Sequence, residues 1–264
     1  MNRIVTLMGL CFLIIVCSSQ EHNPLLQNWD TPFQTPPFNE IKNEHFIPAF
    51  MKGIEEKEAE IKGITETKAA PTFQNTIEAL EKSGEVLDRV SAVFGCFDGA
   101  NTNDEIQEIS REISPIRTRH NDNIYLNDQL FTRIKTIYDT REGLDLSPEQ
   151  LLVLQNYYLR FVRRGADLNA RDKGKLRELN EELSNLYLRF DQNQLKQTNA
   201  IGLIIDQKDD LSGLPEDVVQ AAAEMAKTRD LEGKWVFTLQ RPSFTPFLVN
   251  SDKRKLRETI FKAY

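Results

Sequence analysis

The chain has 264 residues, of which 40% are hydrophobic and 28% are charged. This length and balance are typical of a folded globular protein with a sizeable core, and they argue against extensive disorder. Acidic residues outnumber basic residues by 40 to 33, and the formal net charge is -7. No run of lysine and arginine stands out, so nucleic acid is not expected as a partner, because phosphate binding depends on clustered positive charge.

The first 18 residues have the pattern of a secretory signal peptide. Arg3 precedes an apolar run at residues 4–16, which is too short to span a bilayer. Cleavage after Ser18 would suit a signal peptidase. The alternative is a lipoprotein leader, in which Cys17 carries a lipid and provides the only membrane contact. Both interpretations predict export, to the periplasm or in association with the cell envelope.

Residues 19–44 are predicted to form an extended proline-rich arm, because proline restricts its own backbone and that of the preceding residue. Trp29, Phe33 and Phe38 are the expected anchors of this arm on the body. Helical periodicity then dominates residues 45–264, and the chain is expected to end inside an element.

Long amphipathic helices are expected in the first half of this region. Apolar residues recur at a period near 3.6 residues as far as Phe97, which predicts one helix that begins at Pro71. Isoleucines three and four residues apart cover residues 106–116, where Pro115 predicts a kink rather than an end. A further apolar series lies at residues 124–137.

Two more helices have clear start or face signals. Ser147 to Gln150 has the pattern of a capping box with proline in the first turn, and Gly165 is the expected stop. The helix after it carries an apolar seam that is expected to pack against neighbouring helices of the same chain. The seam residues are Leu176, Leu179, Leu183, Leu186 and Phe190.

The period of the pattern changes beyond residue 200. Short strands are predicted at residues 201–206 and 234–239, with a helix that begins at Pro215 between them. Two strands are marginal unless they pack on something else. The expected fold class is therefore mainly α, with a small β element near residues 200–248 beside a helical body.

The histidines and the body cysteine form no recognisable catalytic motif. A His-Glu-x-x-His zinc site is absent, because none of His22, His45 and His120 has the required neighbours. His120 lies on an apolar stripe and is expected to be a helix-face histidine with a hydrogen-bonded partner. Cys96 is flanked by phenylalanines and is expected to be buried and unreactive. No catalytic or metal-binding residue is assigned, and substrate-binding residues stay unassigned.

Several short motifs follow one another along the chain. The clearest is residues 71–77 with 79–81, which resembles the PTFxNTIxALE signature of the peptidyl-dipeptidase, oligopeptidase A and thimet oligopeptidase family of zinc metallopeptidases. Residues 45–50, 211–215 and 246–248 match further motifs in the order in which that family has them. The resemblance covers about the whole mature chain, and bacterial peptidyl-dipeptidases are the most similar.

The resemblance implies an almost entirely helical fold, in which two halves enclose a channel that admits short peptides. It also implies zinc held by two histidines of His-Glu-x-x-His and a downstream glutamate, all beyond the point that matches Tyr264. The expected function is that of the N-terminal part of an exported zinc metallopeptidase that releases C-terminal dipeptides. Such a chain binds no zinc itself and is inactive without the missing C-terminal catalytic half. The alternative is a stand-alone, non-catalytic helical module that binds peptides or a partner.

Overall fold

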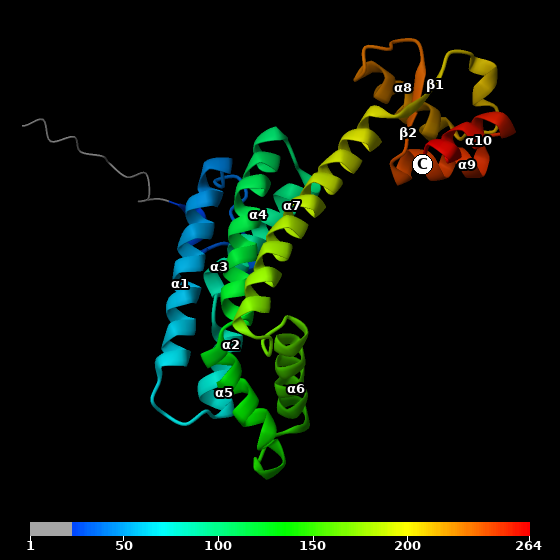
Figure 1. The fold of residues 1–264 in the computed structure, drawn as a ribbon. Helices are drawn as coiled ribbons and strands as arrows, with labels where there is room; N and C mark the ends of the chain where they lie inside the picture. The colour runs from blue at the N-terminus through cyan, green and yellow to red at the C-terminus, as the bar shows by residue number, and fades with distance from the viewer. Residues whose placement is uncertain (1–22) are drawn as a thin grey trace, which may run out of the picture. The chain divides into compact units, whose positions relative to one another are not determined.

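The computed structural model describes residues 23–264, and these residues confirm the mainly α fold class with a small two-stranded sheet (Figure 1). The predicted leader, with Cys17, and His22 lie outside the described residues. In the part that is described, every helix is too short or too polar to cross a bilayer. The described residues divide into two compact units, residues 23–181 and residues 182–264.

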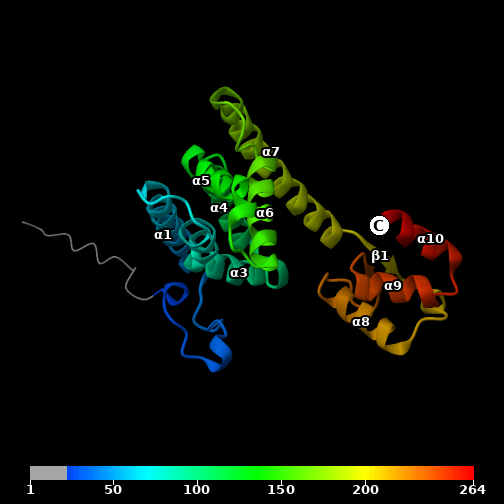
Figure 2. The same cartoon turned by 90° about the horizontal axis from the view of Figure 1, so that it is seen from below.

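The first unit is helical, and its α1, α3 and α4 lie side by side (Figures 1 and 2). Its helical elements are α1 (Phe46–Glu66), η5 (Phe73–Glu78), α2 (Ala79–Lys82), α3 (Glu85–Ala100), α4 (Asp104–Tyr125), α5 (Asp128–Asp139), η6 (Arg141–Gly143), α6 (Pro148–Arg163) and the start of α7 (Ala170–Ala200). Between α1 and α3, the rings of Phe46 and Phe50 meet Phe94 edge to face. A second core cluster joins α5 and α6, where the rings of Phe131 and Phe161 stack.

The proline-rich arm is held by only some of its aromatic residues. The arm contains three short 3-10 helices: η2 (Pro24–Leu26), η3 (Pro32–Gln34) and η4 (Asn43–His45). The Trp29 ring packs on the core cluster of α1 and α3, with the Arg89 guanidinium 5.2 Å from its centre, and the Phe38 ring lies 5.9 Å from that of Phe97. The prediction for Phe33 is wrong, because its side chain is fully exposed on a turn in which it has a positive φ of 59°.

The long helix predicted from Pro71 to Phe97 is broken at Ser83 and Gly84. Gly84 has a φ of +84°, and a Cβ there would lie 2.4 Å from the Lys57 side chain. The Gly84 amide donates to the Glu60 Oε2 at 2.7 Å. The left-handed glycine, whose amide is held by Glu60 of α1, therefore separates one helix from the next, although the apolar period runs on.

The predicted start and stop of α6 are confirmed. Helix α4 continues through Pro115, and α6 begins with a reciprocal capping box between Ser147 and Gln150. Gly165, with a φ of +88°, follows the last turn of α6. These signals depend on residues within one turn of each other, so the surrounding packing does not override them.

The second unit contains the sheet and the last helices. Its elements after α7 are β1 (Gly202–Ile205), η7 (Lys208–Leu211), α8 (Glu216–Lys227), β2 (Trp235–Thr238), α9 (Arg241–Asn250) and α10 (Arg254–Ala263). Both predicted strands are present, and they pair antiparallel with Gly202 opposite Thr238. The buried rings of Phe237 and Phe247 lie 4.6 Å apart in the core of this unit. Helix α9, which contains Pro246, was not predicted.

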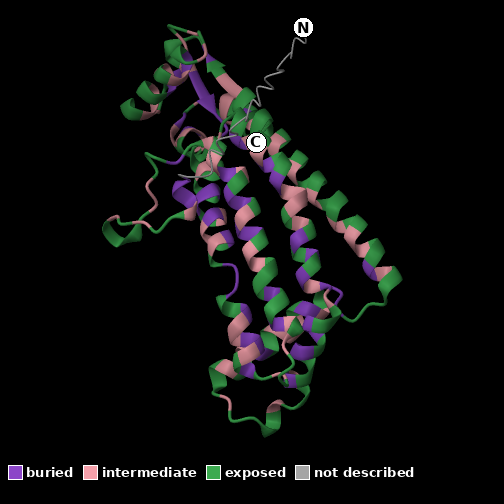
Figure 3. Cartoon of the chain, turned by 90° about the vertical axis from the view of Figure 1, so that its left-hand side faces the viewer, coloured by how far each residue is buried: buried purple, intermediate pink, exposed green. Residues whose placement is uncertain are grey.

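The prediction that the α7 seam packs against helices of the same chain is wrong for most of the seam. Leu176 is partly buried, but Leu179 and Phe190 are 61% and 66% exposed. Figure 3 shows how buried, intermediate and exposed residues are distributed along the helices. Leu183 and Leu186 are about half exposed, at 47% and 50%. The heptad pattern correctly predicted the helix, but it did not determine which surface packs against the apolar seam.

Candidate functional site

A buried arginine anchors the clearest sequence motif, residues 71–81. At the start of η5, the Asn75 amide donates to the Thr72 hydroxyl at 3.1 Å, and the Thr72 amide donates to the Asn75 carbonyl oxygen Oδ1 at 2.9 Å. Arg133 of α5 donates to the same Oδ1 at 2.8 Å, to the Ala69 backbone oxygen at 3.2 Å and to the Thr76 hydroxyl at 3.3 Å. The motif thus ties the start of η5 to α5.

Arg133 is only 7% exposed, and burial lowers the pKa of its guanidinium. The three acceptors offset the loss of hydration of the charged group. Sequence analysis missed Arg133, because its partners lie 57 to 64 residues earlier in the chain. An arginine on an amphipathic helix usually reaches solvent, so the sequence carried no local signal for it.

An open hollow of about 430 Å³ lies beside this motif. It runs between α1 and the η5–α2 segment, and its charged lining groups are Glu60 and Lys82. The remaining lining residues are Gly63, Ile64, Thr67, Asn75, Ala79 and Ser83. The lining mixes aliphatic and hydrogen-bonding groups and holds no histidine or cysteine.

A second hollow, of about 340 Å³, lies between α4 and α7 in the first unit. Asp122 is 9% exposed there, and burial raises the pKa of its carboxyl group, while a hydrogen bond from Asn180 at 2.8 Å opposes the shift. Arg177 donates to Asn123 Oδ1 at 3.0 Å at the rim. The hollow therefore presents side chains of both signs of charge.

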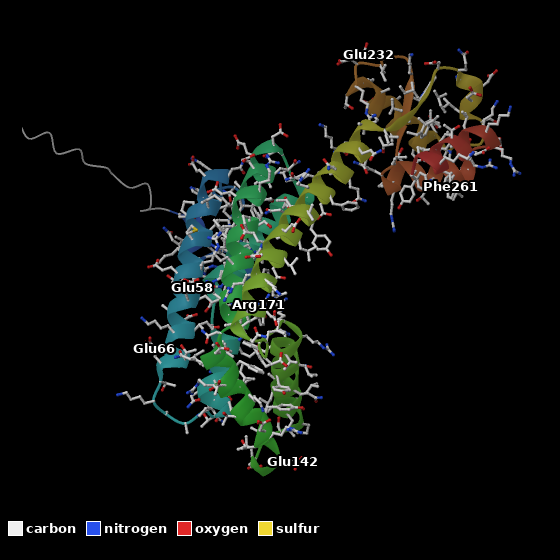
Figure 4. The ribbon with its side chains drawn as sticks, in the orientation of Figure 1. Glu58, Glu66, Glu142, Arg171, Glu232 and Phe261 are labelled. Carbon is white, nitrogen blue, oxygen red and sulfur yellow. The ribbon has the colours of Figure 1, made fainter. Side chains whose placement is uncertain are left out.

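His120 is confirmed as a helix-face histidine with a partner. Its Nδ1 lies 3.3 Å from the Oε1 of Glu58, which is on α1 (Figure 4). The ring is 3% exposed and its Nε2 has no hydrogen-bond partner. Among residues 23–264, no group of histidine, cysteine and acidic side chains has the arrangement of a metal site.

His120 makes the stability of the first unit depend on pH. Burial lowers its pKa from the ordinary 6.5, and Glu58 opposes this only in part. The unfolded chain therefore takes up this proton at a higher pH than the folded chain does. The contribution of neutral His120 is fully present above pH 6.5 and is lost as the pH falls towards the folded pKa.

In the His120→Gln variant, the free energy of unfolding should decrease less between about pH 7.5 and about pH 5.5 than it does in the original chain. Urea unfolding at a series of pH values measures this. Glu58→Gln is the control, because removing the carboxylate disfavours the imidazolium further and steepens the fall. Identical pH profiles for all three proteins would contradict the assignment.

The prediction of a buried Cys96 is wrong. Its neighbours Val93 and Phe94 face the core from α3, whereas Cys96 lies on the other side of that helix and is exposed. The two flanking phenylalanines suggested burial, but a helix turns about 100° per residue, so adjacent positions point in different directions.

No family model matches the chain. Dipeptidyl carboxypeptidase of Salmonella typhimurium is 38% identical over 91% of this chain and 35% of its own length. Oligopeptidase A of Escherichia coli is 26% identical over 92% of this chain and 35% of its own length. Thimet-like oligopeptidase of Dictyostelium discoideum is 21% identical over 83% of this chain.

Over most of its length, the chain is therefore homologous to part of each of these peptidases. It spans about a third of the length of the curated relatives that it matches. The motif that carries the family resemblance, residues 71–81, has a structural role here, because Asn75 and Thr76 are held by Arg133.

Proposed function

We propose that this chain is the helical, non-catalytic part of an exported zinc metallopeptidase that releases dipeptides from the C-termini of short peptides. The observation that carries the proposal is the 38% identity with dipeptidyl carboxypeptidase over 91% of the chain. Export rests on the leader pattern at residues 1–18. Attachment to a membrane would require lipidation of Cys17.

The residues described here do not fit the zinc ion that the resemblance implies. His120 faces Glu58 from a buried position, and the His45 Nδ1 accepts the Lys42 amide at 3.0 Å. Among residues 23–264, no third ligand joins either histidine to form a metal site. We therefore assign zinc binding and peptide-bond cleavage to the remaining two thirds of such a peptidase, and we derive no catalytic step through this chain.

The contribution of this chain is then structural. Helices α1, α3 and α4 form a packed body around Phe46, Phe50 and Phe94, and the two hollows of the first unit lie on its surface. A rigid helical wall can restrict the length and direction of a bound peptide without taking part in its chemistry.

Two measurements on the purified chain test the proposal. Peptide cleavage is followed by mass spectrometry on a short peptide with a free C-terminus, and bound metal is measured after equilibration with zinc and dialysis. We expect no dipeptide release and no stoichiometric zinc, while the Escherichia coli dipeptidyl carboxypeptidase, treated in parallel, gives both. Chelator-sensitive dipeptide release by this chain would refute its non-catalytic role.

The size of the native product separates the two functions that the sequence left open. An antibody against residues 28–264 would detect a band far above 30.4 kDa if the chain belongs to a longer peptidase. A band only at or just below that mass, together with peptide binding by the purified chain, would instead support a stand-alone peptide-binding module.

A further inference from the structure

The first unit contains two separate clusters of buried apolar side chains, and three parts of the chain pass through both. One cluster surrounds Phe46, Phe50 and Phe94, and the other surrounds Phe131 and Phe161. Helix α1 contributes to both clusters, and so do α4 and the segment from α2 to α3. The core of this unit is therefore divided along these helices rather than continuous.

The apolar stripe of each part is interrupted between the two clusters. On α1, Ile54 and Ile61 are seven residues apart with no buried apolar residue between them, and the same is true of Leu80 and Leu87. A similar interruption precedes Ile124 on α4, where the buried side chains are polar. Seven residues of helix span about 10 Å, so the interruptions form a polar layer of about that thickness. The residues of this layer are Lys57, Glu58 and Glu60 of α1, Ser83 and Gly84 before α3, Asp88 of α3, and Arg117 and His120 of α4.

His120 lies within the polar layer and bridges α4 to α1. Its ring is 3% exposed, and Nδ1 lies 3.3 Å from Oε1 of Glu58, whose side chain is half exposed (Figure 4). Because an ionised carboxylate can only accept, we assign the proton of the neutral ring to Nδ1. Nε2 is buried and has no hydrogen-bond partner among residues 23–264. The α7 side chains that contact α4 reach other residues of it: Arg177 reaches Asn123, and Asn180 reaches Asp122.

The charged groups around the ring come from α1, α3 and α4. Burial lowers the pKa of His120, Glu58 opposes this in part, and the cations Lys57 and Arg117 add to the lowering. Lys57 lies 3.8 Å from Asp88 of α3, which partly neutralises it. The neighbours of the ring therefore offer a carboxylate to Nδ1 and positive charge elsewhere.

We propose that the polar layer is a pH-sensitive boundary, at which the first unit opens locally when the His120 ring takes up a second proton. The imidazolium has two N–H donors, and Glu58 satisfies the one at Nδ1. The Nε2–H is then a buried, charged donor without an acceptor, which is costly unless α4 shifts from α1 and admits water. The apolar clusters on either side keep their own contacts, so local opening costs less than unfolding of the whole unit.

Other contacts in the layer are also polar. The Gly84 amide donates to Glu60 at 2.7 Å, and Lys57 pairs with Asp88. Water can replace such contacts once the layer opens, whereas it cannot replace the apolar contacts of the two clusters. The layer is therefore the level of the first unit at which separation costs least.

Hydrogen exchange of the full chain, followed by mass spectrometry at about pH 7.5 and about pH 5.5, tests this boundary. After correction for intrinsic exchange rates, peptides that cover residues 56–60, 83–88 and 117–121 should exchange faster at the lower pH. The upper limit is about tenfold, because in the opened state His120 binds its proton with the ordinary pKa of 6.5. Peptides that cover residues 90–94 and 130–137, in the two clusters, should be unchanged. Equal acceleration throughout the unit would overturn the proposal, and so would none in the layer.

Three variants assign the response to His120. His120→Gln should abolish the acceleration, because glutamine does not titrate. Glu58→Gln should enlarge it, because the carboxylate that favours the imidazolium is gone. His45→Gln is the matched control: His45 is the other histidine among residues 23–264 and lies outside the layer, so the acceleration should persist. Acceleration that persists in His120→Gln would overturn the proposal. These outcomes do not depend on peptidase activity and so are independent of the proposed function.

Discussion

Gly213→Ala is expected to lower the free energy of unfolding of the second unit by about 3 kcal/mol. Gly213 has a φ of +86°, and a Cβ at this position would lie 2.2 Å from the backbone oxygen of Asn250. The left-handed conformation alone costs a side chain about 1 kcal/mol. The rest of the cost arises because the obstacle is backbone, which cannot rotate away as a side chain would.

Hydrogen bonds between Ser212 and Asp252 also hold the turn at residue 213 close to the end of α9. The Asp252 amide donates to the Ser212 backbone oxygen at 2.9 Å, and the Ser212 hydroxyl donates to the Asp252 carboxylate at 2.7 Å. Relief of the clash would separate the turn at residue 213 from the end of α9, so these bonds would weaken as well.

Gly233→Ala is the matched control for this prediction. Gly233 also has a left-handed φ, of +82°, but a Cβ there meets nothing within 4 Å. It should therefore cost only about 1 kcal/mol. Urea unfolding in a Trp29→Phe background, in which Trp235 reports on the second unit, measures both variants. Equal effects at the two glycines would show that the clash with Asn250 contributes nothing.

The second large expected effect is on the first unit, where Arg133→Ala should cost about 3 kcal/mol. The substitution removes three hydrogen bonds from a buried guanidinium to Ala69, Asn75 and Thr76. It also removes a hydrogen-bond donor from the buried Thr76 hydroxyl, and it opens a cavity beside η5. The motif at residues 71–81 should lose its fixed position on α5.

Two further variants identify the cause of this loss. Arg133→Lys separates the contribution of the positive charge from that of the guanidinium geometry, and Arg171→Ala measures the effect of removing an arginine elsewhere. Lysine keeps the charge but cannot reach three diverging acceptors, so it should recover only part of the stability. Arg171 is exposed on α7 (Figure 4), and its replacement should change stability by less than about 0.5 kcal/mol. Unfolding followed by Trp29 fluorescence in a Trp235→Phe background reports on the first unit. A stability loss of similar size for Arg171→Ala would contradict the role given to burial.

Local signals in the sequence were sufficient for most elements of the fold. The capping box at Ser147, the stop at Gly165 and the pairing of two short strands all agree with the structure. Each depends on residues that are neighbours along the chain or on a simple alternation of apolar residues. The family resemblance was equally available, because several short motifs follow in a characteristic order.

Contacts between distant residues decided the rest. The break at Gly84 depends on Lys57 and Glu60 of α1, and Arg133 became part of the motif region only through partners some sixty residues earlier. A periodic pattern does not contain that information, because the same apolar spacing is compatible with several sets of neighbours.

The sequence by itself determined that the chain is mainly helical, where its strongest caps and stops lie, and which peptidase family it resembles. Only the tertiary structure decided that Phe33 and Cys96 face solvent and that the α7 seam between Leu179 and Phe190 is exposed. The physical reason is that amphipathicity specifies which face of a helix is apolar, whereas burial depends on whether another surface of matching shape lies against that face.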